Sequence, residues 1–208
     1  MSYKQKTMGR KSKADERKRE ILVHFYEVVK EEGFENASIA KIADRMEVNP
    51  SLLIHYFKTK EEMVVDLVDF LLDRYNLDEQ AEKLSHVKDI KKRFEFVIDM
   101  LLGEQWMEMS DGHHSVFYAC YYLTTRYGRI LERFQLLYTQ FREMVEAEAK
   151  IWYDNGVIVY DDPTQVAEYI ITLNEGMTYY EGVLMDPTTF GKRSKNLREM
   201  AIKTLTTP

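Results

Sequence analysis

Between Ser38 and Lys60 the sequence gathers side chains that can bind phosphate groups and the edges of bases. They carry hydroxyl, amide, imidazole and ammonium groups, which position a protein on a nucleic acid and read its sequence. The candidates are Ser38, Asn49, Ser51, His55, Tyr56 and Lys60. By contrast, the chain has no Gly-x-Ser-x-Gly elbow, no glycine-rich phosphate loop and no His-Glu-x-x-His motif. The motifs therefore favour binding over catalysis.

Two short helices and a tight turn are expected to position these side chains. Apolar residues of the first helix recur at i, i+3, i+4 and i+7, which predicts one buried stripe; they are Ile39, Ile42, Ala43 and Met46. Ser38 stands at its N-cap position. Asn49 can cap a second helix with Pro50 at its first position, where a missing amide does no harm. The spacing is that of a helix-turn-helix that reads DNA.

The second helix has a buried side and a side left for contact. The buried side is expected to consist of Leu53, Tyr56 and Phe57, which leaves Ser51, Leu52 and His55 on other faces. Leu52 has no hydrogen-bonding group, so at a base edge it reads only shape or a thymine methyl. A Thr-x-x-Glu capping box at residues 59–62 then opens a further helix.

Residues 34–63 resemble the N-terminal DNA-binding domain of the tetracycline-repressor (TetR) family of bacterial regulators. The resemblance rests on Gly33-Phe34, on Ser38-Ile39 and on the run from His55 to Met63. It implies an all-α fold with an N-terminal three-helix DNA-binding domain and a C-terminal helical domain for ligand binding and dimerisation. The implied DNA contacts are Ser38, Asn49, Pro50, Ser51, Leu52, His55, Tyr56 and Lys60. Glu47 stands where the family usually has glycine, and the aromatic order differs, so base readout is not transferred.

The positive charge lies at the motif end of the chain. Residues 1–60 carry 13 Lys+Arg against 9 Asp+Glu, whereas residues 61–208 carry 16 against 26. We expect residues 1–14 to form a flexible basic arm, in which Arg10, Lys11 and Lys13 contact phosphate or the minor groove. A solvated tail without DNA contact is the alternative. No apolar core of a secretion signal follows the arm.

Residues 15–75 are expected to form the DNA-binding domain and residues 76–208 the second domain. Residues 76–89 are polar and acidic, which suggests a linker or loose turn. Helices are predicted over residues 90–102, ending at Gly103, and over about 129–153, ending at Asn155-Gly156. A second long helix is predicted to begin at the Asp162-Pro163 cap. The single Cys120 agrees with a reducing cytoplasm, and no apolar run reaches the length of a membrane span.

Aromatic residues concentrate in the second domain and supply candidate walls for an effector site. The candidates are Trp106, Phe117, Tyr118, Tyr121, Tyr122, Glu175 and Tyr179. Tyrosine walls beside a glutamate suit a lipophilic cation, and they suit a neutral aromatic or acyl compound equally. For any single residue, ordinary core packing is the simpler explanation. No cofactor is expected. A metal is not expected either, because the adjacent histidines His113 and His114 point in different directions.

Two apolar stripes on the long helices suggest a homodimer. The candidate interface residues are Phe134, Tyr138, Phe141, Val145, Tyr169, Leu173, Met177 and Tyr180. Two recognition helices one DNA turn apart demand a palindromic operator, whereas packing inside the monomer is the alternative use of these stripes. The favoured function is a ligand-responsive repressor on double-stranded DNA. A helical adaptor that binds protein without reading DNA sequence is the alternative.

Overall fold

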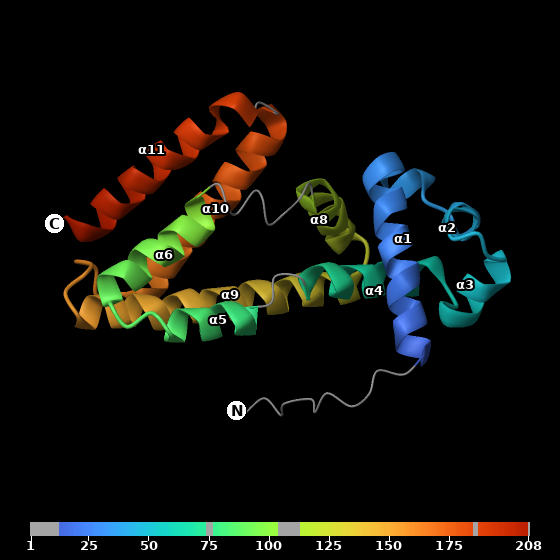
Figure 1. The fold of residues 1–208 in the computed structure, drawn as a ribbon, viewed down its shortest axis with the longest axis horizontal. Coiled ribbons are helices and arrows are strands. Elements are labelled where there is room, and N and C mark those ends of the chain that lie inside the picture. Colours follow the sequence, from blue (N-terminus) through green and yellow to red (C-terminus); the bar gives the residue numbers. More distant parts are fainter. Residues whose placement is uncertain (1–12, 74–76, 104–112, 185–186, 208) are drawn as a thin grey trace. The chain divides into compact units, whose positions relative to one another are not determined.

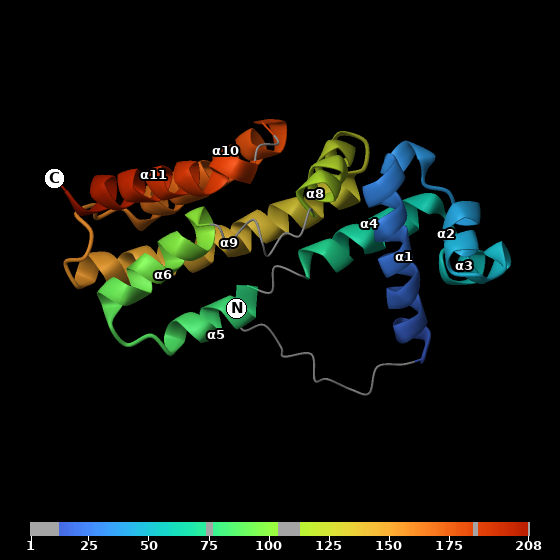
Figure 2. The same ribbon diagram turned by 45° about the horizontal axis from the view of Figure 1, so that its top comes forward.

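The computed structural model describes residues 13–73, 77–103, 113–184 and 187–207, and every regular element in these ranges is helical (Figures 1 and 2). The chain divides into two compact units, residues 1–74 and 75–208. The all-α prediction is confirmed. Each unit is built around its own core and is described separately below.

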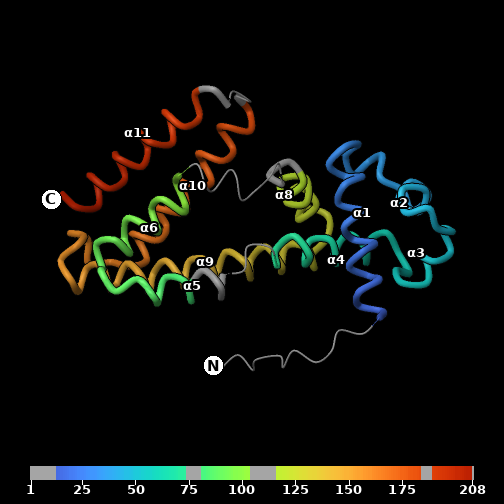
Figure 3. The backbone as a smooth tube through the Cα atoms, viewed as in Figure 1, coloured from blue at the N-terminus to red at the C-terminus, as the bar shows by residue number. Residues whose placement is uncertain are grey.

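The first unit consists of α1 (Lys13–Asn36), α2 (Ile39–Arg45), α3 (Pro50–Tyr56) and α4 (Lys60–Leu72) (Figure 3). Its core is made of fully buried side chains from all four helices and the turn after α3: Ile21, Phe25, Ile42, Leu53, Phe57, Met63 and Leu67. Gly33 has a φ of +78° inside the last part of α1, a conformation that glycine adopts without penalty. The bend brings the Phe34 ring to 6.0 Å from that of Phe25.

Helices α2 and α9 (Gly128–Asp154) end in the same hydrogen-bonded motif, with different residues at its critical position. After α2, the Glu47 amide donates to the Asp44 carbonyl at 3.0 Å and the Val48 amide to the Ala43 carbonyl at 2.9 Å. After α9, Gly156 takes the place of Glu47 in the matching pair of bonds. This is the Schellman motif, which needs a left-handed residue. Gly156 has a φ of +67° and Glu47 a φ of +55°.

Replacing Glu47 with glycine is expected to raise the free energy of unfolding of the first unit by about 1 kcal/mol, because an L-residue is strained in this conformation. The opposite change after α9, Gly156→Ala, is expected to lower the free energy of unfolding of the second unit by about the same amount. Chemical denaturation followed by circular dichroism measures both. Glu47→Gln removes the charge and keeps the strain, so equal stabilisation by Glu47→Gln would assign the effect to charge.

The second unit contains seven helical segments in the described ranges. They are α5 (Leu77–Ser85), α6 (Ile90–Leu102), α8 (His113–Tyr122), the 3₁₀ turn η1 (Leu123–Thr125), α9, α10 (Pro163–Leu184) and α11 (Pro187–Thr206). The helices predicted to end at Gly103 and near Asn155 are confirmed. So is the cap of α10, where Asp162 Oδ1 accepts from the amides of Thr164 at 2.9 Å and Gln165 at 3.2 Å.

The prediction of a linker over residues 76–89 was wrong, because α5 occupies most of it. Leu84 of α5 is fully buried in the core of the second unit. Packing of this leucine helps to hold the short helix, since tertiary packing supplies most helical stability. Leu77, Ala81 and Leu84 recur at i, i+4 and i+7, so the segment carries a short helical pattern that the linker prediction did not use.

Helix α6 is fixed at both ends by helices from later in the chain. At its first turn, Arg93 forms a largely buried pair with Glu148 of α9, in which Glu148 is buried and Arg93 is partly exposed, with Arg93 Nε donating to Glu148 Oε2 at 2.6 Å. At its last turn the unpaired carbonyls accept from side chains: Leu101 from Asn174 of α10 at 2.6 Å, and Leu102 from Ser194 of α11 at 2.7 Å. Helix ends leave such carbonyls without intrahelical donors. The core thus sets the position of α6 against α9, α10 and α11.

Candidate functional sites

The helix-turn-helix of the first unit is held by the capping bonds that the sequence predicts. Ser38 Oγ accepts from the Lys41 amide at 3.3 Å, and Asn49 Oδ1 accepts from the Ser51 amide at 2.9 Å. Thr59 Oγ1 accepts from the Glu62 amide at 3.0 Å. Ser38 and Asn49, both candidate DNA contacts, therefore orient their own helices first, and the lone pairs left over remain for other donors.

Helix α3 presents a polar face to solvent. Pro50, Ser51 and His55 are exposed and Leu52 and Tyr56 partly exposed, whereas Leu53 is buried in the core beneath them. The His55 and Tyr56 rings meet edge to face at a centroid distance of 5.3 Å. A helix of this kind, anchored on one side and polar on the other, can enter a major groove.

Lys60, the candidate phosphate contact, is oriented by the backbone of α1. Its ammonium donates to the carbonyl oxygen of Phe34 at 3.2 Å. An ammonium has three donors, so this bond leaves others for a phosphate oxygen.

The described part of the first unit is acidic, which is unusual for a surface that binds phosphate. Residues 13–73 carry 9 Lys+Arg against 14 Asp+Glu. The cations of α2 are moreover engaged by α1: Arg45 donates to both oxygens of Glu31, at 2.6 and 2.9 Å, and Lys41 pairs with Glu32. The Glu31 bonds raise the pKa of Arg45, and Arg45 lowers the pKa of Glu31. Residues 1–12, with four cations and no acid, hold the remaining positive charge.

The predicted basic arm lies largely outside the described residues, including Arg10 and Lys11. Lys13 and residue 14 belong to α1, so the helix begins within the predicted arm. No glycine or proline stands between Lys13 and Gly33 to interrupt the helix. Asp15 and Glu16 lie in its first turn, where negative charge interacts favourably with the helix dipole.

In the second unit, aromatic rings from α8, α9 and α10 form a continuous chain of contacts. The Tyr179 ring meets that of Tyr118 edge to face at 6.0 Å, and the Tyr118 ring meets that of Phe117 at 5.8 Å. The Phe117 and Phe134 rings are 5.0 Å apart, and Tyr121 lies 5.7 Å from Phe134. The structure thus brings together four of the rings proposed as effector walls.

A carboxylate lies at the tyrosine end of this chain. Glu175 of α10 accepts a 2.8 Å hydrogen bond from the hydroxyl of Tyr138 on α9. Burial raises the pKa of Glu175, and the Tyr138 bond offsets part of that shift. Burial and the nearby Glu175 charge raise the pKa of Tyr118, whose buried hydroxyl has no hydrogen-bond partner. The site therefore combines a desolvated carboxyl group with an unsatisfied hydroxyl.

Two of the effector candidates have no described contact with this cluster. Trp106 lies outside the described residues, and Tyr122 is exposed on the surface. Tyr138, a candidate dimer contact, donates a hydrogen bond to Glu175. The sequence could not show this, because the two residues are 37 positions apart on different helices.

The structure corrects much of the proposed dimer interface. Phe134, Phe141, Val145 and Met177 are buried inside the second unit, because the stripes of α9 and α10 pack against each other and against α6. Tyr169 and Leu173 lie half-buried against the same core. Tyr180, 57% exposed, is the candidate most accessible to a partner.

Other chemistry finds little support in the described part of the chain. No group of three metal-binding side chains occurs there, and the side chains of His113 and His114 lie outside the described ones. Cys120 is buried, which raises its pKa to about 12 and keeps the thiol protonated and unreactive. None of the described helices combines the length and apolarity needed to span a membrane.

A helix-turn-helix unit followed by a separate all-helical unit is the build of a one-component transcriptional regulator that binds DNA. Residues 21–67 match the model of the bacterial regulatory proteins of the tetR family, and residues 89–207 match that of the tetracyclin repressor-like C-terminal domain. The chain therefore belongs to the TetR family. No curated protein matches it by sequence.

Several solved structures share the fold at low sequence identity. A TetR transcription regulator from Haloarcula marismortui is 19% identical, with a TM-score of 0.77 over 91% of this chain and 98% of that one. A regulator from Cytophaga hutchinsonii is 13% identical, with a TM-score of 0.76 over 96% and 100%. A putative regulator from Saccharomonospora viridis, solved with choline, is 16% identical, with a TM-score of 0.72 over 89% and 93%.

Proposed function

We propose that this regulator is a repressor that binds a palindromic operator as a homodimer and is released by a small hydrophobic or cationic effector. The observation that carries the proposal is the pairing of a capped, outward-facing α3 with a separate helical unit that holds a desolvated glutamate among aromatic rings. Its place of action is the cytoplasm, at the operator DNA. Catalysis is not part of the proposed function.

DNA recognition is assigned to the outer face of α3 and its flanks. Ser51 and Leu52 would meet base edges, with Asn49 and Pro50 at the start of the helix. Ser38, His55, Tyr56 and Lys60 would contact the DNA backbone, together with Arg10, Lys11 and Lys13. Backbone contacts fix position and base contacts supply sequence preference. One α3 covers only a few base pairs, so two copies are needed for specific binding.

Binding of the effector, which releases the regulator from DNA, is assigned to the aromatic cluster of α8, α9 and α10. An effector can shift the regulator only if it binds the released state better than the DNA-bound state. Choline, the compound bound to the Saccharomonospora viridis protein, supports a small organic cation as one candidate class. The dimer contact is assigned to the exposed residues of α10, Tyr180 among them.

Selection of bound sequences from a random DNA pool at about physiological salt tests the proposal. Specific binding is expected to exceed non-specific binding by roughly 10³ or more, and the enriched sites are expected to be palindromic. Absence of enrichment by the ligand-free protein would contradict the repressor function and favour a helical adaptor that does not read DNA sequence.

The variants Lys60→Ala and Leu52→Ala are expected to affect DNA binding in different ways. Loss of the Lys60 ammonium should weaken binding to all DNA sequences alike. It should also lower the slope of log affinity against log salt by about one for each contacted phosphate. Loss of Leu52 should change which base pairs are preferred at its position. Fluorescence anisotropy on the selected operator and on single-base variants, over a salt series, separates the two. If Lys60→Ala changes sequence preference, its assignment as a backbone contact is wrong.

A further inference from the structure

We propose that the cluster of Tyr118, Tyr138, Glu175 and Tyr179 binds the positively charged group of the effector, which makes this regulator a sensor of organic ammonium compounds. The inference rests on the proposed function, because it names the chemical class of the effector. It goes further in choosing cations over neutral aromatic and acyl compounds. It also assigns Glu175 as the residue that makes this choice.

Glu175 is an incompletely paired carboxyl group. Among the side chains that the structure describes, its one hydrogen bond comes from Tyr138 and it pairs with no lysine or arginine; the side chains of His113 and His114 are not among them. Glu175 is partly buried, whereas the two fully buried glutamates described in the second unit are both paired: Glu148 with Arg93 and Glu181 with Arg193. A desolvated carboxylate is costly without a counter-charge, and buried charges in proteins are normally paired. An ammonium group would complete the site at Glu175 as the two arginines do elsewhere.

Tyr118 supplies a second unsatisfied group beside the first. Its hydroxyl is buried and has no hydrogen-bond partner, and it is close enough to Glu175 for the carboxylate charge to raise the Tyr118 pKa. An oxygen of this kind can accept a hydrogen bond from an ammonium N–H. Buried polar groups without partners are rare in native proteins, and an absent ligand is one explanation for them.

The rings around these oxygens suit the rest of an organic cation. Tyr118 and Tyr179 meet edge to face at 6.0 Å, and Tyr179 is 63% exposed, so the cluster is accessible from solvent. The negative face of an aromatic ring attracts ammonium groups, and quaternary ammonium ions are bound in cages of such rings. Phe117 and Phe134 continue the apolar wall away from the carboxyl group.

The same groups disfavour the other effector classes. The titratable groups that act on Glu175 or are acted on by it, in the described helices, are the Tyr138 and Tyr118 hydroxyls of α9 and α8. Neither provides positive charge, so an anion would meet the carboxylate without compensation. A neutral ligand would leave the carboxylate unpaired when ionised. When Glu175 is ionised, an ammonium cation supplies the counter-charge, and one with N–H groups also supplies donors for the Glu175 and Tyr118 oxygens.

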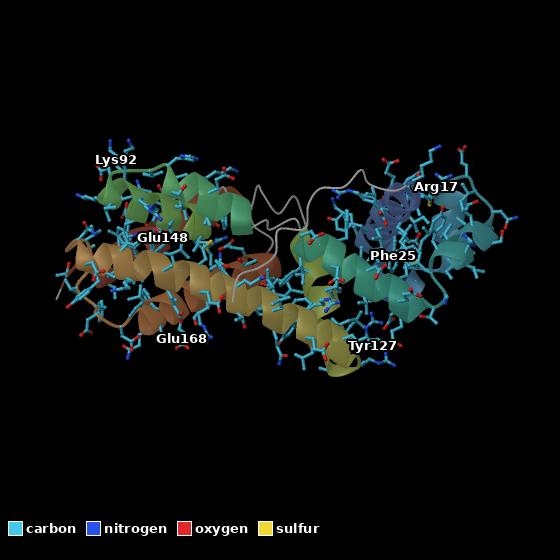
Figure 4. All side chains as sticks on the ribbon, turned by 90° about the horizontal axis from the view of Figure 1, so that it is seen from below. Arg17, Phe25, Lys92, Tyr127, Glu148 and Glu168 are labelled. Atoms are coloured by element: carbon cyan, nitrogen blue, oxygen red, sulfur yellow. The ribbon has the colours of Figure 1, made fainter. Side chains whose placement is uncertain are left out.

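Three probes of similar size separate charge from hydrogen bonding. Phenethylammonium carries a charge and N–H donors, benzyltrimethylammonium carries a charge without donors, and 2-phenylethanol carries a donor without charge. Isothermal titration calorimetry of the full-length protein is expected to show both cations binding at least about tenfold more tightly than the alcohol. Glu175→Gln should remove that preference and leave alcohol binding nearly unchanged. Glu168→Gln, on the outer side of α10, is the matched control and should behave as the unaltered protein (Figure 4).

A pH series adds a readout that a purely structural role of Glu175 would not move. Benzyltrimethylammonium does not titrate, so a change in its affinity reports the protein. Because the pKa of Glu175 is raised, the carboxyl group ionises as pH rises through that pKa, and cation affinity should rise with it. The free energy of unfolding should fall over the same range, since the folded state holds the proton more tightly than the unfolded chain. Glu175→Gln should lose both trends.

Equal binding of the alcohol and the cations, no binding of any probe, or cation binding unaffected by Glu175→Gln would each overturn the proposal. Tyr118→Phe guards against misreading a folding defect. Removing the unpartnered hydroxyl should raise the melting temperature and weaken the binding of phenethylammonium. The control Tyr153→Phe, on the exposed side of α9, should change neither quantity. Operator selection is measured separately. If the protein binds the cations but selects no operator, only the proposed regulator function is contradicted. If it selects an operator but shows no preference for cations, only the proposed cation site is contradicted.

Discussion

Replacing Glu148 with alanine is expected to lower the free energy of unfolding of the second unit by about 3–5 kcal/mol, which is a large part of the stability of a domain. The side chains of Arg93 and Glu148 are only 16% and 7% exposed, and two hydrogen bonds join them. Those bonds raise the pKa of Arg93. The alanine variant would leave the Arg93 charge desolvated without a partner, between α6 and α9.

Urea denaturation followed by circular dichroism, at one fixed protein concentration, measures this loss. The control is Glu146→Ala on the same helix, which breaks an exposed pair with Arg142 and should cost at most about 0.5 kcal/mol. The double variant Arg93→Met with Glu148→Leu should recover most of the stability, because well-packed apolar residues can replace a buried ion pair. A similar loss for Glu146→Ala and Glu148→Ala would contradict the role assigned to burial.

Removing residues 1–12 is expected to reduce operator affinity by at least about tenfold at moderate salt and to flatten its salt dependence. This segment holds Lys4, Lys6, Arg10 and Lys11, whereas the structured residues 13–73 carry an excess of acid. Each cation that contacts phosphate contributes roughly 0.9 to the slope of log K against log salt, so the dimer can lose up to about seven. Fluorescence anisotropy between low and physiological salt measures both quantities.

A charge-neutral arm is the matched control for this deletion. Replacing the same four residues with glutamine keeps the length of the chain and removes only its charge, so it should reproduce the effect of the deletion. If neither change alters the slope, the arm is a solvated tail, and the phosphate contacts come from Lys60 and its neighbours. If the deletion acts and the glutamine variant does not, contacts other than charge hold the arm on DNA.

The helix-turn-helix could be predicted in detail because its signals are local. Ser38, Asn49 and Thr59 cap helices through bonds to amides two or three residues away, and each bond is present in the structure. The Asp162 cap of α10 was predictable for the same reason. Glu47 is a departure that the sequence shows and only the backbone explains, since its left-handed φ is where glycine is usual.

Tertiary structure decided the features that join residues far apart in the chain. Apolar spacing identified the stripes on α9 and α10, but it could not tell which residues pack inside the unit, and Phe141, Val145 and Met177 proved to be interior. Helix α5 carries only a short helical pattern, Leu77, Ala81 and Leu84, in an otherwise polar segment, and only the folded core shows that Leu84 is buried. An amphipathic pattern records that a face is buried and says nothing about its partner.

The chain by itself therefore determined the helix-turn-helix, α6, α9, α10 and its family, because hydrogen bonds and periodicity within a few residues fix these, whereas α5 and α11 were recognised only in the folded structure. The candidate effector site was another matter. Glu175 and Tyr138 are 37 positions apart, and Arg93 and Glu148 are 55 apart. Which carboxyl group receives a cation and which stays unpaired was decided only when α6, α8, α9 and α10 packed together, because burial and proximity between helices are properties of the folded core.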